Sequence, residues 1–216
     1  MMTEADVLDL LERVGAFRAG HFVFTSGRHG DKYINKDAIY PNTRETSALC
    51  KTFAQHFKDQ AVDVVIGPAI GAAILSQWTA YHLTDMNGRD VLSVYADKDG
   101  AGGFVLKRGY DRLVKGKRVL IVEDLMTTGG SVKKVIEVAR SAGAEVVGVA
   151  AICNRGGVKA ADVGDPPRFV ALVNVQLDSW EGQSCALCDR KIPINTEIGH
   201  GKAFVTATGN QGKMAL

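Results

Sequence analysis

The chain's most informative segment reads Val119-Leu120-Ile121-Val122-Glu123-Asp124-Leu125-Met126-Thr127-Thr128-Gly129-Gly130-Ser131. Its first four residues are apolar, which is typical of a buried strand in a parallel sheet. Two acidic residues follow, then a loop of small and hydroxyl-bearing residues, then apolar residues at helical spacing from Ser131 onward. The segment therefore predicts a strand, a loop and a helix in succession.

The composition of the loop indicates a phosphate site. Backbone N–H groups of a loop made of small residues, together with the positive end of the following helix, bind anions readily. Gly129 and Gly130 allow close approach, and the hydroxyls of Thr127, Thr128 and Ser131 add donors.

The carboxylates of Glu123 and Asp124 suit a ligand that also offers hydroxyl groups, such as a ribose 2,3-diol. A sugar phosphate accounts for both halves of the segment. The alternative is that the two acids are ordinary loop residues and the Thr/Gly run is a helix cap.

Elsewhere the chain alternates between short apolar runs and helical patterns. Strands are predicted near residues 62–66, 91–95, 119–122, 146–152 and 169–173, and helices over 43–57, 70–83 and from 131 onward. Near the amino terminus, Phe22–Phe24 and Tyr33–Ile34 flank a polar turn and predict a hairpin. This order predicts an α/β fold with a mainly parallel sheet, which binds ligands at the carboxyl ends of its strands. The tail beyond Thr208 is predicted to be disordered.

Composition excludes several classes of protein. The 216 residues are 46% hydrophobic and 23% charged, with a net charge of +2, which favours neither disorder nor a nucleic-acid partner. No apolar run approaches the length of a membrane span, and the amino terminus lacks the pattern of a signal peptide. We expect a cytoplasmic protein with small-molecule partners, no nucleic acid and no membrane.

The segment at residues 119–131 resembles the phosphoribosyl pyrophosphate motif of type I phosphoribosyltransferases. The chain lacks both the G-x-x-x-x-G-K-[ST] and the G-x-G-x-x-G nucleotide motifs. The resemblance implies the type I fold in a single domain, with a core over about 41–174 and a hood from about 1–40 plus 175–205. It implies that phosphoribosyl pyrophosphate contacts Glu123, Asp124, Leu125, Met126, Thr127, Thr128, Gly129, Gly130 and Ser131.

Over most of its length the chain resembles the orotate phosphoribosyltransferases in particular. The hood segments Phe24-Thr25-Ser26-Gly27-Arg28 and Tyr33-Ile34-Asn35 resemble those that cover the pyrimidine. The resemblance implies that orotate contacts Tyr33, Ile34, Thr127 and Arg155. A guanidinium can form planar, paired hydrogen bonds to the carboxylate and carbonyls of orotate, whereas a purine base has no carboxylate. An exposed arginine at a strand end is the alternative interpretation of Arg155.

Two loops resemble further parts of that family's site. Ile70 and Gly71, after Gly67-Pro68-Ala69, occupy the pyrophosphate-contact positions, although many relatives have lysine in place of Gly71. The segment from Asp97 to Arg108 lies where the family has a mobile catalytic loop shared across a homodimer. We expect Lys98, with Asp124, to be catalytic. The loop lacks the family's second lysine and histidine, so Lys107 and Arg108 are alternatives, as is a glycine-rich surface hairpin.

Cys185 and Cys188 form a C-x-x-C pair, and only His200 suggests itself as a third ligand. Because a closed zinc site needs four ligands, a thiol pair without metal is the favoured interpretation. Similar cysteines occur in one branch of the orotate enzymes.

The resemblance implies transfer of 5-phosphoribosyl from phosphoribosyl pyrophosphate to orotate, giving orotidine 5'-phosphate and pyrophosphate in pyrimidine synthesis. It implies Mg²⁺ as cofactor, held mainly through the substrate rather than by protein ligands. Two alternatives are a purine phosphoribosyltransferase and a regulator that binds phosphoribosyl pyrophosphate with weak catalysis. The departures at Thr25, Gly71 and the mobile loop leave the regulator open.

Overall fold

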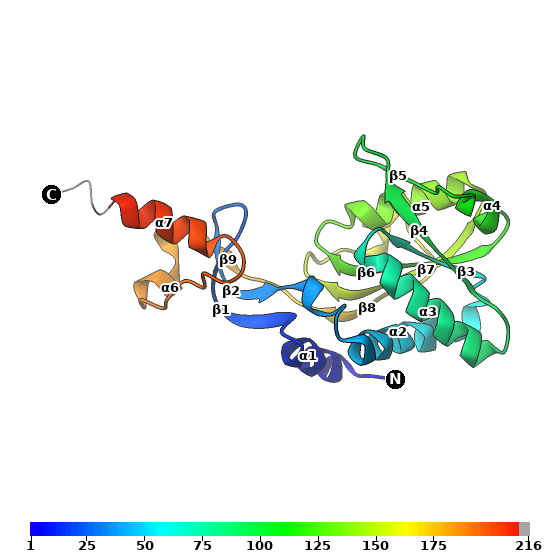
Figure 1. Cartoon of the computed structure of the whole chain (residues 1–216), viewed down its shortest axis with the longest axis horizontal. Coiled ribbons are helices and arrows are strands. Elements are labelled where there is room, and N and C mark those ends of the chain that lie inside the picture. Colours follow the sequence, from blue (N-terminus) through cyan, green and yellow to red (C-terminus); the bar gives the residue numbers. More distant parts are fainter. Residues whose placement is uncertain (212–216) are drawn as a thin grey trace. The chain divides into compact units, whose positions relative to one another are not determined.

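The computed structural model describes residues 1–211, which form two compact units (Figure 1). The larger comprises Met1–Leu11 and Lys36–Gln176, and the smaller comprises Glu12–Asn35 and the chain from Leu177 onward. The hood was expected to extend over about 1–40. Residues 1–11 and 36–40 of that range instead group with the larger unit. The reason is contact: Glu4 accepts a hydrogen bond from Asn174 N, and Lys36 is paired with Asp124.

A six-stranded sheet with the order β5-β4-β3-β6-β7-β8 forms the centre of the larger unit. Every neighbouring pair is parallel except β4 and β5, which form an antiparallel hairpin. The expected α/β class is thus confirmed. The strands are β3 (Val64–Pro68), β4 (Leu92–Lys98), β5 (Phe104–Val105), β6 (Arg118–Met126), β7 (Glu145–Asn154) and β8 (Phe169–Asn174).

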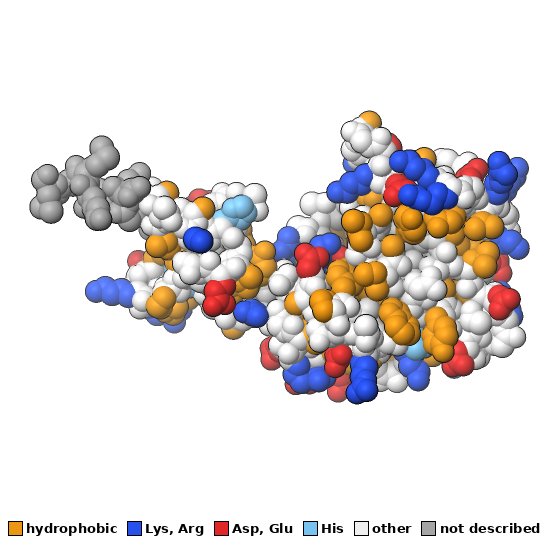
Figure 2. Space-filling view, in the orientation of Figure 1, with side chains coloured by type: hydrophobic (Ala, Val, Ile, Leu, Met, Phe, Trp, Pro, Cys, Tyr) orange, Lys and Arg blue, Asp and Glu red, His pale blue; other side chains and the backbone are white. Residues whose placement is uncertain are grey.

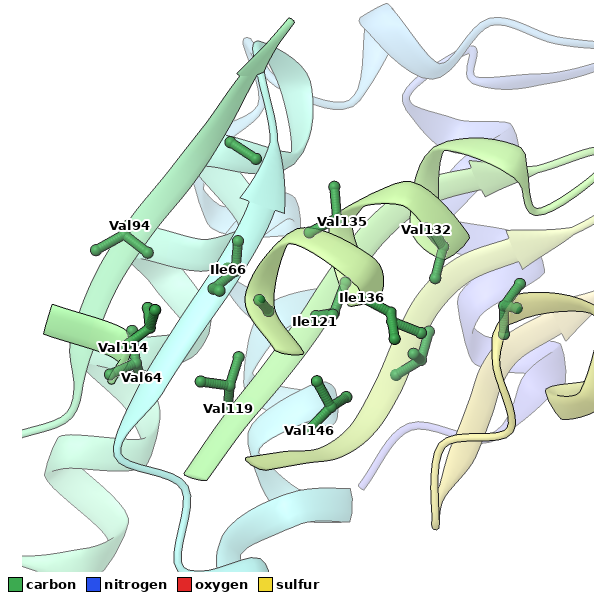
Figure 3. Close-up of a cluster of buried hydrophobic side chains, with 14 of the residues drawn as sticks. Val64, Ile66, Val94, Val114, Val119, Ile121, Val132, Val135, Ile136 and Val146 are labelled. Carbon is green, nitrogen blue, oxygen red and sulfur yellow. The ribbon is translucent and has the colours of Figure 1, made fainter. Parts of the chain in front are cut away.

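Helices cover both faces of this sheet. Helix α5 packs on β6 and β7, while α2 and α3 pack together, with α3 against β3 and β4. Figure 3 shows Val132, Val135 and Ile136 of α5 over alternate residues of the strands, as the two-residue side-chain period requires. The helices of the larger unit are α1 (Glu4–Arg13, which continues into the smaller unit), α2 (Thr43–Phe57), α3 (Gly71–Asn87), α4 (Tyr110–Val114) and α5 (Gly130–Ser141), with 3-10 turns at Lys36–Ala38, Lys58–Gln60 and Ala160–Val163.

The smaller unit contains a three-stranded antiparallel sheet with the order β1-β2-β9. Arg28 ties β2 to β9, because its Nε donates to Ser179 Oγ at 2.9 Å. The elements of this unit are β1 (Phe17–Val23), β2 (His29–Ile34), β9 (Ser179–Trp180), a 3-10 turn (Gly182–Ser184), α6 (Ala186–Asp189) and α7 (Gly201–Gln211).

Two expectations about element boundaries were wrong. Strand β6 continues through Met126, because it keeps pairing with β7 as far as Met126 opposite Asn154, so the two acids lie inside the strand. Helix α7 extends to Gln211, past the expected start of disorder at Thr208, and the rest of that tail lies outside the described residues. Among residues 1–211, no helix has the length and apolar character needed to cross a membrane.

Candidate functional site

The small-residue loop joins the end of β6 to the start of α5 and lines a cavity of about 150 Å³. Gly129 has φ 73°, in the left-handed region, and a Cβ there would lie 2.9 Å from Val158 Cγ1 and closer still to Val163. Backbone conformation and packing therefore both require glycine. Thr127–Ser131 thus line a hollow at the N-terminus of α5, and the binding of phosphate there stays a prediction.

The two acids before this loop are buried, with Glu123 7% and Asp124 4% exposed. Asp124 Oδ2 lies 2.9 Å from Lys36 Nζ and accepts a second hydrogen bond from the Tyr40 hydroxyl. Glu123 Oε1 accepts a hydrogen bond from the backbone N–H of Asp124 at 3.0 Å. The carboxylate of Asp124 is therefore held in place by residues from the segment between β2 and α2.

Burial and charge set the protonation of this group. Burial, and then the charge of Asp124, raise the pKa of Glu123 above its usual range. Burial lowers the pKa of Lys36, but the hydrogen bond and charge of Asp124 outweigh it, so this pKa is raised. Burial and Asp124 also raise the pKa of Tyr40. At neutral pH, Lys36 is therefore a cation and Tyr40 a neutral donor.

A second cavity, of about 190 Å³, lies beside these acids. It brings together several of the residues that the sequence singled out. They are Ile70, Gly71, Lys98, Glu123, Asp124, Leu125 and Ser131, joined by Lys36. Residues from the ends of β3, β4 and β6 therefore meet at one edge of the sheet, as expected for ligand binding in this architecture.

Gly71 is required by this packing. A Cβ at this position would lie 2.7 Å from Tyr40 Cζ and 2.8 Å from Asp124 Oδ2. The absence of a side chain at position 71 thus leaves space for the contact between Tyr40 and Asp124.

Arg155 and Thr127, both expected at the orotate site, are in contact. Arg155 Nε donates to Thr127 Oγ1 at 2.8 Å, and its backbone N–H donates to Met126 O at 2.9 Å. A Cβ on Gly156 would overlap the carbonyl of Thr127, so glycine permits this close turn. A cavity of about 530 Å³ lies beside Arg155, lined by the ends of β7 and β8.

Tyr33 and Ile34, the other residues expected at orotate, lie on β2 in the smaller unit. The Tyr33 ring packs within that unit, with its centroid 5.4 Å from that of Phe22. Their contact with a base stays a prediction.

The expected catalytic loop is the hairpin between β4 and β5, with Lys98 paired opposite Phe104. Asp99 organises the tip by accepting hydrogen bonds from the N–H groups of Ala101 and Gly103, each at 2.8 Å. Arg108 is paired with Asp97 and lies over the Tyr95 ring, 5.3 Å from its centroid. Lys98 lines the cavity, whereas Arg108 is already engaged by neighbours in its own hairpin.

Lys36 and Tyr40 are the site residues that sequence reasoning missed. They follow the hood segment Tyr33-Ile34-Asn35 directly, but no local pattern links them to an aspartate more than eighty positions later. The turn at Lys36–Ala38 places them beside β6.

Comparison with known proteins gives a consistent result. Residues 35–183 match the family model for the phosphoribosyl transferase domain. An orotate phosphoribosyltransferase of Caldicellulosiruptor bescii is 39% identical over 195 residues, which cover 89% of this chain and 96% of that protein. Among solved structures, the orotate phosphoribosyltransferase of Mycobacterium tuberculosis with Fe(III) dicitrate is similar, with TM-score 0.65, 25% identity, and coverage of 80% and 96%. The same enzyme in complex with phosphoribosyl pyrophosphate shares the fold, with TM-score 0.60, 22% identity, and coverage of 79% and 95%.

Proposed function

The chain belongs to the orotate phosphoribosyltransferases, and from that premise we propose that it transfers 5-phosphoribosyl from phosphoribosyl pyrophosphate to orotate. The products are orotidine 5'-phosphate and pyrophosphate, in pyrimidine synthesis. One observation supports the proposal: two buried acidic side chains and the N-terminus of α5 lie at the same strand end, and Lys98 lines the same cavity as the two acids.

The donor occupies the two adjacent cavities at the end of β6. Its 5'-phosphate accepts hydrogen bonds from the backbone and hydroxyls of Thr127–Ser131, where the positive end of α5 favours an anion. The carboxylates of Glu123 and Asp124 accept hydrogen bonds from the ribose hydroxyls. Its pyrophosphate lies against the loop at Ile70 and Gly71, within reach of Lys98.

The reaction is a displacement at the anomeric carbon. A ring nitrogen of orotate forms a bond to this carbon and loses its proton to water, while the bond from the carbon to the pyrophosphate oxygen breaks and pyrophosphate leaves. Negative charge grows on the leaving pyrophosphate, where the Lys98 ammonium stabilises it. The acids orient the sugar, and neither is needed as a nucleophile.

Magnesium fits this site as a partner of the substrate. Carboxylate oxygens and phosphate oxygens are the hard donors that Mg²⁺ prefers. Asp124 Oδ2 already accepts hydrogen bonds from Lys36 and Tyr40, so we place the ion mainly on pyrophosphate and ribose oxygens. When bound with the donor, the ion neutralises charge on the pyrophosphate.

Arg155 is the residue that we assign to base selection. Its guanidinium lies beside the cavity at the ends of β7 and β8, and its Nε is oriented by Thr127. A guanidinium presents N–H donors in one plane and can form two hydrogen bonds to the carboxylate of orotate, a group that purine bases lack. Tyr33 and Ile34 of the hood are proposed to cover the ring.

We also propose a homodimer in which the tip of the β4–β5 hairpin is shared between subunits. Figure 2 shows apolar side chains gathered over α3 on one face of the larger unit. On this helix Tyr81 is 60% and Ile74 36% exposed, and Ile74 lines an apolar hollow of about 550 Å³ together with Trp78. The buried free thiols of Cys50 and Cys153 suit a reducing compartment, so we place the protein in the cytoplasm.

The test is loss of orotate, followed by its ultraviolet absorbance, with phosphoribosyl pyrophosphate and Mg²⁺ present. Adenine, hypoxanthine and xanthine serve as rival bases in parallel reactions. We expect Mg²⁺-dependent consumption of orotate alone. Turnover of a purine base would instead indicate a purine enzyme, and donor binding with no turnover of any base would indicate a regulator.

A further inference from the structure

The smaller unit contains a cluster of metal-binding side chains that the proposed reaction does not use. Cys185 and Cys188 lie beside two histidines, His21 of β1 and His29 of β2. One ligand atom from each residue lies within 4.8 Å of all the others. His200, the third ligand considered from the sequence, instead has its Nε2 3.1 Å from Thr25 Oγ1. The two histidines beside the cysteine pair therefore lie more than 150 positions earlier in the chain.

The distances between donor atoms approach those of a tetrahedral site. His21 Nε2 lies 3.6 Å from Cys185 Sγ and 3.7 Å from Cys188 Sγ, and His29 Nδ1 lies 3.4 Å from Cys188 Sγ. Zinc bonds of about 2.3 Å to sulfur and about 2.0 Å to nitrogen place such N and S atoms about 3.6 Å apart around one centre. Three donor pairs therefore already have the required separation.

The two histidine nitrogens are closer together, at 2.8 Å between His21 Nε2 and His29 Nδ1. This is a hydrogen-bond distance, and a shared proton accounts for it when no metal is bound. Zinc would replace that proton and widen the gap by about half an ångström. The same four residues can therefore exist as a proton-bridged or a metal-bridged cluster, and only the second holds an ion.

The surroundings orient one ligand, His21, as in a zinc site. His21 Nδ1 lies 2.8 Å from the carbonyl of Ile192, so this nitrogen carries the proton and donates, leaving Nε2 for a metal. A backbone or carboxylate partner on the second ring nitrogen is typical of zinc-binding histidines. Three of the four side chains are shielded from water, since His21 is 2% exposed and His29 and Cys185 are fully buried, while Cys188 is partly exposed.

We propose that His21, His29, Cys185 and Cys188 bind one Zn²⁺ ion in a closed, structural site. Two thiolates and two imidazoles in a tetrahedral arrangement are a donor set that Zn²⁺ favours. Four protein ligands leave no open position for water or substrate, so the ion has no role in the chemistry.

The position of the site gives it a stabilising role. The ligands connect β1, β2 and the segment around α6, which come from two distant parts of the chain. The buried apolar residues of the smaller unit are few among the described residues, namely Ala16, Phe22, Val23, Ile34 and Leu187, besides Cys185. Units with so small a core commonly need a metal or disulfides for stability, and here the cysteines are free. The ion would hold the sheet and the carboxyl-terminal segment together.

The test uses the full-length protein, produced with zinc in the medium, purified under reducing conditions and analysed by elemental mass spectrometry. We expect about one zinc per chain. Cys185→Ser and His29→Gln should each reduce the zinc content several-fold. His200→Gln and Cys50→Ala are matched controls, one histidine and one cysteine outside the cluster, and should retain zinc.

Two further measurements do not depend on how well a variant folds. Replacing zinc with Co²⁺ in the wild-type protein should give the intense visible absorption of a tetrahedral ion and a thiolate-to-cobalt charge-transfer band. Removing zinc with a chelator should lower the melting temperature, and adding zinc should restore it. Wild-type protein without zinc that melts at the same temperature with and without the ion would overturn the proposal. A Cys185–Cys188 disulfide in the purified protein would also overturn it. The same holds if His200→Gln loses zinc while Cys185→Ser and His29→Gln retain it.

Discussion

Asp124 is the residue on which the proposed donor site depends. Its Oδ2 accepts hydrogen bonds from Lys36 and Tyr40, and Gly71 leaves the space in which they meet. A carboxylate fixed by two donors keeps its orientation before the ligand arrives, so little ordering remains to be done on binding. The neighbouring Glu123 accepts a hydrogen bond from the backbone N–H of Asp124, and its raised pKa reflects burial and then the charge of Asp124.

Asp124→Asn should weaken binding of phosphoribosyl pyrophosphate more than binding of orotate. A hydrogen bond to a charged group is worth about 1.5–3 kcal/mol, so a loss of about tenfold or more in donor affinity is expected. Calorimetric titration with each substrate measures the two affinities separately. Asp63→Asn, at the opposite end of β3 and bonded to Arg89 at 3.0 Å, is the control and should bind the donor normally. Undiminished donor affinity in Asp124→Asn would contradict the assigned role.

The β4–β5 hairpin is the element that brings a cation, Lys98, to the cavity proposed for the donor. Its short antiparallel pairing positions Lys98, while Asp99 fixes the turn beyond it. The tip projects from the rest of the larger unit in Figure 1, which suits a loop that covers a ligand.

Lys98→Ala should lower kcat at least about tenfold, because the growing charge on pyrophosphate loses its partner. The KM for orotate should change little. Lys107→Ala is the matched control on the same hairpin and should retain most activity. The opposite result, with Lys107→Ala inactive and Lys98→Ala active, would transfer the role to Lys107. Steady-state kinetics with both substrates varied distinguishes the two.

Stability of the whole molecule should depend on the protonation of Glu123. Its folded-state pKa is raised, so the protein favours the protonated carboxyl. This contribution is fully present below the pKa of the unfolded chain, which is near 4.5, and is lost as pH rises through the folded-state value. In the absence of ligand, wild-type protein should therefore lose unfolding free energy relative to Glu123→Gln between about pH 5 and about pH 8, on the order of a few kcal/mol. Urea denaturation of both proteins across this range measures the difference, and a constant difference would contradict it.

Assembly should depend on the apolar face of α3. Tyr81→Glu should give monomers, because a charge in the centre of an apolar interface is costly to bury. Light scattering after size exclusion measures the mass. Leu113→Glu on α4, where the leucine is 43% exposed, is the control and should remain dimeric. A monomeric wild-type protein would contradict the homodimer.

Mixing subunits tests whether the hairpin is shared. A hybrid of Lys98→Ala with Asp124→Asn contains one intact site only if Lys98 serves the partner's donor site. Recovered activity would support sharing, whereas an inactive hybrid would assign Lys98 to the cavity of its own chain.

The sequence by itself determined the parts of this protein that are contiguous. The alternation of apolar runs and helical patterns predicted the α/β class, and residues 119–131 predicted the phosphate loop, because strand, acids, glycines and helix follow one another in the chain. Arg155 was expected at the site because it closes a predicted strand and resembles the family's orotate-contacting arginine.

Tertiary structure alone decided which distant side chains complete each group. Lys36 and Tyr40 meet Asp124 across 88 and 84 positions, and His21 meets Cys188 across 167. No periodicity in the sequence predicts such a contact, because local patterns depend on neighbours along the chain. Hydrogen bonds and metal binding depend on distance in space instead. For the same reason the cysteine pair was assigned no complete ligand set until β1 and β2 placed two histidines beside it.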